Sequence, residues 1–184
     1  MAGKFQNKYR IPSARWQTWD YSSEGLYFIT INAVHHECLF GRIVDTEMYL
    51  SEYGQIVDEE WNKSFEIRSE LFCDAFVIMP NHIHAILRIE NPVETHGRAS
   101  VHGGGIRGGN GIAFREPKSI SSFVAGFKSA VTTRINTLRQ TKGKPVWQER
   151  FHDRVIRDYE ECRRIGAYID SNIQNWNDDR YFKE

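Results

Sequence analysis

The sequence has 184 residues, 40% of them hydrophobic and 26% charged, so it can bury a sizeable core and we expect one domain over 1–184 rather than a disordered chain. Its 24 Lys and Arg residues balance 24 Asp and Glu residues, which argues against a uniformly basic nucleic-acid binder. No run approaches the roughly eighteen apolar residues of a membrane span, and the N-terminus lacks the apolar stretch of a signal peptide. We therefore expect a soluble, cytoplasmic protein with no membrane contact.

The charges are unevenly distributed along the chain. Acidic residues dominate 45–70, whereas basic residues dominate 115–144. A basic stripe of this kind suits a phosphate backbone, but it is equally typical of the solvated face of a helix. The pattern alone leaves both interpretations open.

The first elements are a strand and a helix. Residues 26–34 are rich in aromatic and β-branched side chains, which predicts a strand. Asp45 and Thr46 offer capping chemistry before a carboxylate-rich segment of helical character. We expect this helix to be interrupted or bent near Gly54.

Two apolar runs follow, at 72–79 and 82–90, and only Pro80 and Asn81 separate them. So short a connection allows an antiparallel hairpin and excludes a parallel crossover. The glycine-rich segment 91–117 lacks the pattern of a phosphate-binding loop, and we interpret it as a flexible insert.

The C-terminal half predicts a helix, a strand and a second helix. Apolar residues recur at three- and four-residue steps over 118–139, which indicates an amphipathic helix. Residues 146–158 alternate and predict a strand, after which Asp158 and Glu161 have the spacing of a capping box for a helix to about Asn172. The order of elements indicates an α+β domain in which helices cover an antiparallel sheet.

His82 and His84 are the chemically informative pair within the second apolar run. Side chains alternate along a strand, so both imidazoles project to the same side. Two neutral imidazoles on a strand form half of a metal site. The alternative is that they are ordinary surface or hydrogen-bonded histidines.

The string MPNHIHAIL around this pair closely resembles the histidine motif of the single-tyrosine HUH endonucleases, in particular the IS200-like transposases and the REP-associated tyrosine transposases. Further similarity to that family extends over 10–30, 127–136 and 146–172, in the expected order. The resemblance implies a ferredoxin-like fold, with the histidine motif on a central strand and a catalytic tyrosine on the C-terminal helix.

The same resemblance implies site residues. Tyr168 occupies the position of the nucleophile, although its spacing from neighbouring isoleucines also fits a core aromatic. Asn172, one helical turn further on, is the expected third metal ligand beside His82 and His84. The family carries Gln here, or Asn followed by Pro, whereas Ile173 follows in this chain, so direct and water-bridged coordination both stay open. The family uses Mg²⁺ or Mn²⁺, but these donors would also suit Zn²⁺.

The implied activity is that of a metal-dependent endonuclease and strand transferase for single-stranded DNA beside imperfect hairpins. It would proceed through a covalent 5′-phosphotyrosine intermediate, as a monomer or a homodimer. Phosphate contacts are expected from five basic residues: Lys128, Arg134, Arg139, Lys142 and Lys144. One alternative is a domesticated hairpin-binding protein with little cleavage. Another is a cyclic phosphodiesterase, which would be expected to show two separated HxT or HxS motifs rather than a single HxH.

Overall fold

The structure is a computed structural model in which residues 4–5, 8–9, 23–90 and 118–182 are described. The predicted insert at 91–117 lies outside the described residues. Near the N-terminus, β1 (Lys4–Phe5) and β2 (Lys8–Tyr9) form a small antiparallel pair. No helix in the described ranges is long and apolar enough to cross a membrane.

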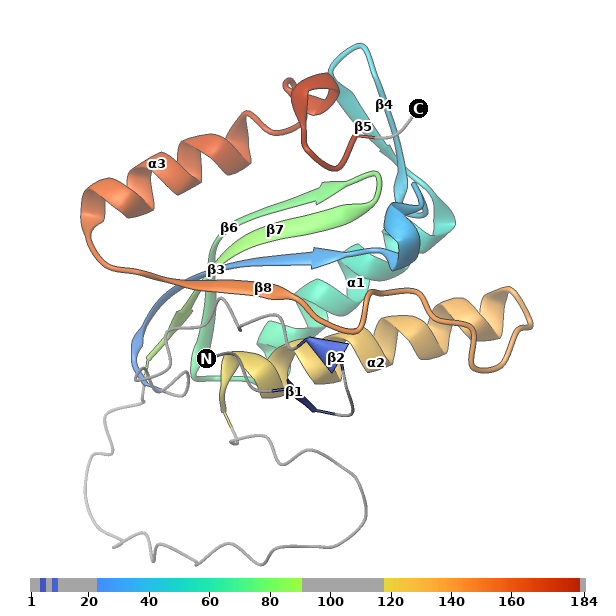
Figure 1. Cartoon of the computed structure of the whole chain (residues 1–184), viewed down its shortest axis with the longest axis horizontal. Helices are drawn as coiled ribbons and strands as arrows, with labels where there is room; N and C mark the ends of the chain where they lie inside the picture. The colour runs from blue at the N-terminus through green and yellow to red at the C-terminus, as the bar shows by residue number, and fades with distance from the viewer. Residues whose placement is uncertain (1–3, 6–7, 10–22, 91–117, 183–184) are drawn as a thin grey trace, which may run out of the picture.

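Four strands form the main sheet, and each is antiparallel to its neighbours. In spatial order they are β6 (Leu71–Met79), β7 (His82–Ile89), β3 (Gly25–Asn32) and β8 (His152–Ile156). Two helices connect them: α1 (Glu52–Ile67) between β3 and β6, and α2 (Ile120–Leu138) between β7 and β8. This order is ferredoxin-like and confirms the predicted α+β class (Figure 1). The antiparallel pairing of β6 with β7, in which Met79 lies opposite His82, confirms the predicted hairpin across Pro80 and Asn81.

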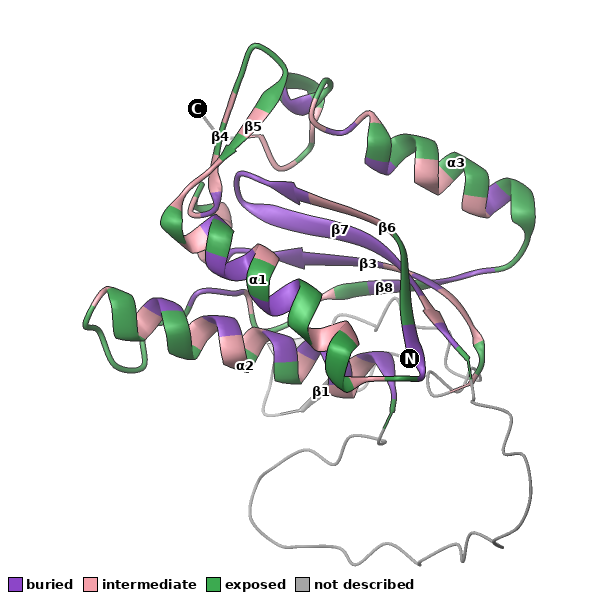
Figure 2. Cartoon of the chain, turned by 180° about the vertical axis from the view of Figure 1, so that it is seen from behind, coloured by how far each residue is buried: buried purple, intermediate pink, exposed green. Residues whose placement is uncertain are grey.

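The two faces of the sheet pack against different helices. On β7, Ile83, Ala85 and Leu87 join the large core under α1 and α2, whose buried residues face the sheet (Figure 2). The alternate residues of β7 point to the other face, where α3 (Tyr159–Asp170) packs over β6 and β7. Ile86 belongs to the small apolar cluster beneath α3. Strand alternation therefore assigns His82 and His84 to the α3 face.

The predicted helix start at Asp45 and Thr46 is wrong. These residues form the turn between β4 (Gly41–Val44) and β5 (Glu47–Leu50), with φ angles of 49° and 62°. Two successive positive φ angles are the geometry of a tight two-residue hairpin turn. The helix begins at Glu52, after Ser51, whose hydroxyl accepts a hydrogen bond from the Gly54 amide at 3.1 Å.

Gly54 does not interrupt the helix, because α1 runs without a break from Glu52 to Ile67. Its role is close packing: a Cβ at this position would lie 2.0 Å from the carbonyl oxygen of Phe40. No side chain fits there unless the backbone moves.

Replacing Gly54 with alanine is therefore expected to destabilise the fold by about 1–3 kcal/mol, the usual cost of overpacking. The matched control is Gly126→Ala in α2, where a Cβ would meet no atom within 4 Å. Alanine should stabilise that helix by up to about 1 kcal/mol, because glycine is the poorer helix former. Urea unfolding of both variants measures the difference, and equal midpoints would contradict this account.

The closing strand is shorter than the predicted 146–158. Residues 146–148 pair with the end of β3 and the turn after it: Val146 accepts from the Val34 amide at 2.8 Å, and the Gln148 amide donates to Asn32 at 2.9 Å. Regular pairing resumes only at His152. The chain thus brings Gln148 next to η1 (Val34–His36), the short 3₁₀ turn after β3.

The predicted cap of the last helix is confirmed. Asp158 accepts from the Glu161 amide at 2.8 Å, and α3 begins at the next residue, Tyr159. The helix ends at Asp170 rather than Asn172, and a second 3₁₀ turn, η2 (Trp176–Asp178), follows it.

Candidate active site

The two motif histidines open β7 directly after its turn. Both are buried, with 0% of His82 and 1% of His84 exposed, so they are not the surface residues of the alternative interpretation. Their ring centroids lie 4.5 Å apart on the α3 face of the sheet. A buried pair of imidazoles in contact requires partners that settle where each proton lies.

The proton of His82 is placed by the preceding residue. Its Nδ1 lies 2.8 Å from the Asn81 side-chain oxygen, which can only accept, so Nδ1 carries the hydrogen. The lone pair then belongs to Nε2. This atom is buried and has no hydrogen-bond partner among the described residues, as expected for a nitrogen that binds a metal.

His84 joins the sheet to α3. Its Nδ1 lies 2.8 Å from the Thr30 hydroxyl on β3, and its Nε2 lies 3.2 Å from the Tyr168 hydroxyl. The ring stacks on Phe28 with centroids 5.3 Å apart. The imidazole is thus held on three sides by residues of β3 and α3.

Both histidines are neutral near pH 7. Burial lowers the pKa of His82 to about 2, with further lowering by His84, His36 and Arg180. Burial also lowers the pKa of His84 to about 3, assisted by Arg180. Neutral imidazoles keep the lone pairs that a metal requires, so the pair fits a cation.

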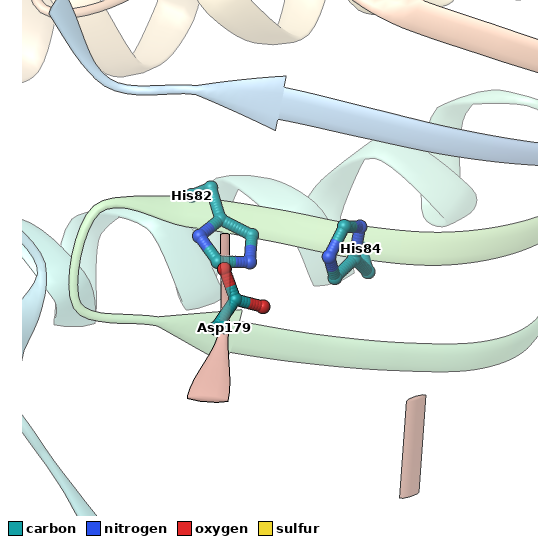
Figure 3. Close-up of side chains that lie close together, drawn as sticks. All are labelled: His82, His84 and Asp179. Carbon is teal, nitrogen blue, oxygen red and sulfur yellow. The ribbon is translucent and has the colours of Figure 1, made fainter. Parts of the chain in front are cut away.

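Asp179 completes a candidate metal centre that the sequence did not reveal. One ligand atom from each of His82, His84 and Asp179 can be chosen so that all three lie within 4.8 Å of one another. Figure 3 shows the carboxylate beside the His82 ring, on the side to which the imidazoles project. Its Oδ1 accepts from the Tyr181 amide at 2.6 Å, which orients it. The only signal in the sequence was an acidic pair, Asp178 and Asp179, outside the resembling segments.

Tyr168 reaches this site from α3, where its hydroxyl lies 3.2 Å from Nε2 of His84. It is 43% exposed and therefore not the core aromatic of the alternative interpretation. Burial raises its pKa, whereas a hydrogen bond with the Asn172 side chain lowers it. Asn172 itself is buried, and in the described part of the chain its Oδ1 has no partner. The fold thus gathers the predicted phenol, amide and imidazoles in one place.

Comparison with known proteins identifies a relative and a fold. No family model matches the chain. An uncharacterized protein of Haemophilus influenzae strain Rd is 32% identical over 170 residues, which is 92% of both chains. This chain belongs to the family of that protein. The similarity to that relative extends over nearly the whole length of this chain.

Among solved structures, that of a REP-associated tyrosine transposase bound to a REP hairpin aligns with a TM-score of 0.57. The alignment covers 86% of this chain and 72% of the other, at 19% identity, and shows that the two share a fold. A transposase candidate from Deinococcus radiodurans aligns with a TM-score of 0.40 at 14% identity, too low to support an argument.

The predicted phosphate-binding residues lie apart from the histidines, on α2 and the turn after it. Lys128 donates to the carbonyls of Gln148 and Glu149, at 2.5 and 3.0 Å. Arg134 pairs with Glu59 and Glu60 of α1. Arg139 donates to the Asn136 side chain and, at 2.7 Å, to the carbonyl of Lys144. The side chains of Lys142 and Lys144 are exposed.

Proposed function

We propose that the chain is a single-tyrosine HUH transposase, a metal-dependent endonuclease and strand transferase for single-stranded DNA. The observation that carries the proposal is the 3.2 Å approach of the Tyr168 hydroxyl to Nε2 of the buried, neutral His84. A phenol is thereby held at the edge of a prospective metal centre. The shared fold and the motif MPNHIHAIL add support.

The candidate centre has a mixed set of nitrogen and oxygen donors. His82, His84 and Asp179 would hold the ion, with Asn172 as a further amide oxygen, directly or through water. We assign Mg²⁺ or Mn²⁺, and the imidazoles favour Mn²⁺ of the two. When bound, such an ion polarises the scissile phosphate and stabilises its developing charge.

The residues of the chain then carry out a transesterification. The Tyr168 oxygen attacks the phosphorus and forms a phosphotyrosine bond, while the bond to the 3′ oxygen of the preceding nucleotide breaks. The phenol loses its proton to solvent, and the leaving 3′ oxygen gains one. Because one phosphodiester replaces another, the step is reversible, and a second DNA end with a free 3′ hydroxyl can displace the tyrosine.

The substrate in this proposal is single-stranded DNA beside an imperfect hairpin. The solved transposase that shares the fold is bound to a REP hairpin, which supports this choice. We therefore place the hairpin stem against basic residues and the adjoining single strand at Tyr168.

The decisive experiment is a search for a covalent adduct. The protein is incubated with Mn²⁺ and labelled oligonucleotides from palindromes that flank the encoding gene, each with a single-stranded extension. A band that resists denaturation and carries a label placed on the 3′ side of the cleaved phosphate supports the proposal, because that part of the strand stays bound to the tyrosine. Tight hairpin binding without adduct or cleavage would instead identify a domesticated binding protein, and binding of neither hairpin nor single strand would refute both.

The exposed lysines after α2 are predicted to contact phosphates. The double variant Lys142→Ala/Lys144→Ala should weaken hairpin binding and reduce the slope of log affinity against log salt by roughly 0.7–0.9 for each phosphate that is no longer neutralised. Lys63→Ala on α1 is the matched control, because Lys63 is also exposed but lies in the acidic segment. Fluorescence anisotropy across a salt series measures both. Unchanged slopes in the double variant would exclude these residues from the interface.

A further inference from the structure

Asn81 occupies the turn before the histidine motif and is 0% exposed. Within the described residues, each hydrogen bond of its side chain connects it to another part of the site. The amide nitrogen donates to the carbonyl of Tyr181 at 2.7 Å and to that of His36 at 3.1 Å. The amide oxygen lies 2.8 Å from Nδ1 of His82. One carboxamide thus connects β7, η1 and residues 171–182 after α3, the C-terminal segment.

The oxygen of this amide determines which nitrogen of His82 is available. Since a carbonyl oxygen only accepts, the hydrogen must reside on Nδ1, and the lone pair remains on Nε2. Nε2 is the buried atom that has no partner in the described chain. Without the amide oxygen, the neutral ring would be free to place its hydrogen on Nε2.

The nitrogen of the same amide holds the segment that carries Asp179. It binds the carbonyl of Tyr181, while the amide of Tyr181 donates to Asp179 Oδ1 at 2.6 Å. The Tyr181 ring also contacts His82, with centroids 4.9 Å apart, and stacks on His36 at 5.0 Å. Asn81 and Tyr181 are 100 residues apart in the sequence, so this hydrogen bond joins the turn before the histidines to the C-terminal segment that carries Asp179.

The second hydrogen bond of the Asn81 amide nitrogen, to the carbonyl of His36, connects it to the 3₁₀ turn η1. His35 and His36 have φ angles of 53° and 54°, in the left-handed region of backbone conformation that residues other than glycine rarely occupy. Surrounding contacts must therefore hold η1 in place. The Asn81 amide supplies one of them, and the Gln148 side chain lies 2.8 Å from Nε2 of His36.

We propose that Asn81 is the positioning residue of the candidate metal centre. Its amide oxygen keeps the hydrogen of His82 on Nδ1 and so leaves the lone pair on Nε2. Its amide nitrogen binds the carbonyl of Tyr181 and so holds the segment that carries Asp179. This role rests on the proposed function, since it presumes that the centre binds a cation. Asn81 would act without touching the metal, because both of its polar atoms are already engaged.

Two substitutions separate the halves of the amide. Asn81→Asp keeps an acceptor for His82 but replaces the donor with an oxygen that faces two carbonyls. Asn81→Leu has a similar size and removes both functions. The matched control is Asn62→Asp, the same chemical change on the exposed face of α1.

Three measurements on the full chain test the role. In the metal-free parent, ¹⁵N shifts of His82 should show the hydrogen on Nδ1; Asn81→Asp should keep that tautomer and Asn81→Leu should lose it. Amide exchange at Asp179, Tyr181 and Phe182 should rise roughly tenfold in both variants, because the hydrogen bonds that hold this segment are removed. Titration with Mn²⁺ should show at least about tenfold weaker binding in both, within the range for removal of a side chain that supports a ligand.

The outcomes distinguish this role from the proposed function. Parental amide exchange and Mn²⁺ affinity in both variants would overturn the role of Asn81. So would a hydrogen on Nε2 of His82 in the parent, a result that requires no variant to fold. A parent protein that binds no Mn²⁺ would overturn the proposed function and the metal-positioning role with it.

Discussion

Replacing Tyr168 with phenylalanine is expected to abolish the covalent protein–DNA adduct while the protein still folds and binds hairpin DNA. Phenylalanine keeps the ring, which packs edge-on against Phe28 at 6.4 Å, and removes only the attacking oxygen. Loss of a covalent nucleophile costs a factor on the order of 10⁴ or more in rate. The measurement is a denaturing gel of the Mn²⁺ reaction with labelled hairpin and single-strand substrate.

The same variant should bind Mn²⁺ as tightly as the parent or more tightly. In the structure the Tyr168 hydroxyl lies 3.2 Å from Nε2 of His84, the atom whose lone pair a metal would need. Without the hydroxyl, that competing interaction disappears. Calorimetric titration of parent and variant with Mn²⁺ provides the comparison.

Tyr159→Phe is the control for the nucleophile. Tyr159 is 77% exposed in the first turn of α3, whereas Tyr168 lies near its end. The control variant should form the adduct at the parental rate. An adduct that persists in Tyr168→Phe would show that the nucleophile lies elsewhere. Loss of folding in that variant would show that the phenol is chiefly structural.

The projection of His82 and His84 to the same side of their strand, and the central hairpin of the main sheet, were predictable from local patterns. Only two residues separate the runs that become β6 and β7, which left a hairpin as the simple connection. Alternation then placed His82 and His84 on one side without knowledge of the other strands. Their burial was less evident, because it results from α3 and the C-terminal segment, which come much later in the chain.

Asp179 could not be predicted because no local rule brings it to the histidines. The chain must leave α3, turn through η2 and return over the β6–β7 turn, where Asn81 binds Tyr181. Neither periodicity nor capping encodes such a path. Asp45 and Thr46 show a different limit: short polar residues serve helix caps and tight turns alike, and only the pairing of β4 with β5 separates the two.

The uneven charge along the sequence has a structural cause that composition alone did not show. The acidic segment contains α1, the basic segment contains α2, and the two helices pack side by side. Arg134 bridges them by pairing with Glu59 and Glu60. Part of the basic stripe therefore serves helix packing, which leaves the exposed Lys142 and Lys144 as the better candidates for phosphate contacts.

Removing the imidazoles is expected to abolish cleavage that depends on a divalent ion. Each of His82→Ala and His84→Ala deletes one of the two nitrogen donors, and the double variant deletes both. Because both rings are fully buried, these truncations should also lower the free energy of unfolding by a few kcal/mol, in the manner of other buried side chains. Urea unfolding must therefore accompany the cleavage assay. Cleavage retained by a folded double variant would remove the metal site from this account.

Asp179→Asn tests the centre without a cavity, since the amide keeps the shape of the carboxylate and loses its charge. We expect Mn²⁺ affinity to fall by more than the roughly 10–100-fold that removal of a supporting side chain costs. Asp178→Asn is the matched control, because this neighbour is exposed and lies outside the cluster of donors. If Asp179→Asn binds Mn²⁺ as the parent does while Asn172→Leu does not, the third donor is Asn172, whose buried oxygen has no partner in the described structure. Weak binding in Asp179→Asn alone assigns the carboxylate as the third ligand, and the hydrogen bonds that link Asp179 to Tyr181 and Tyr181 to Asn81 then place that ligand.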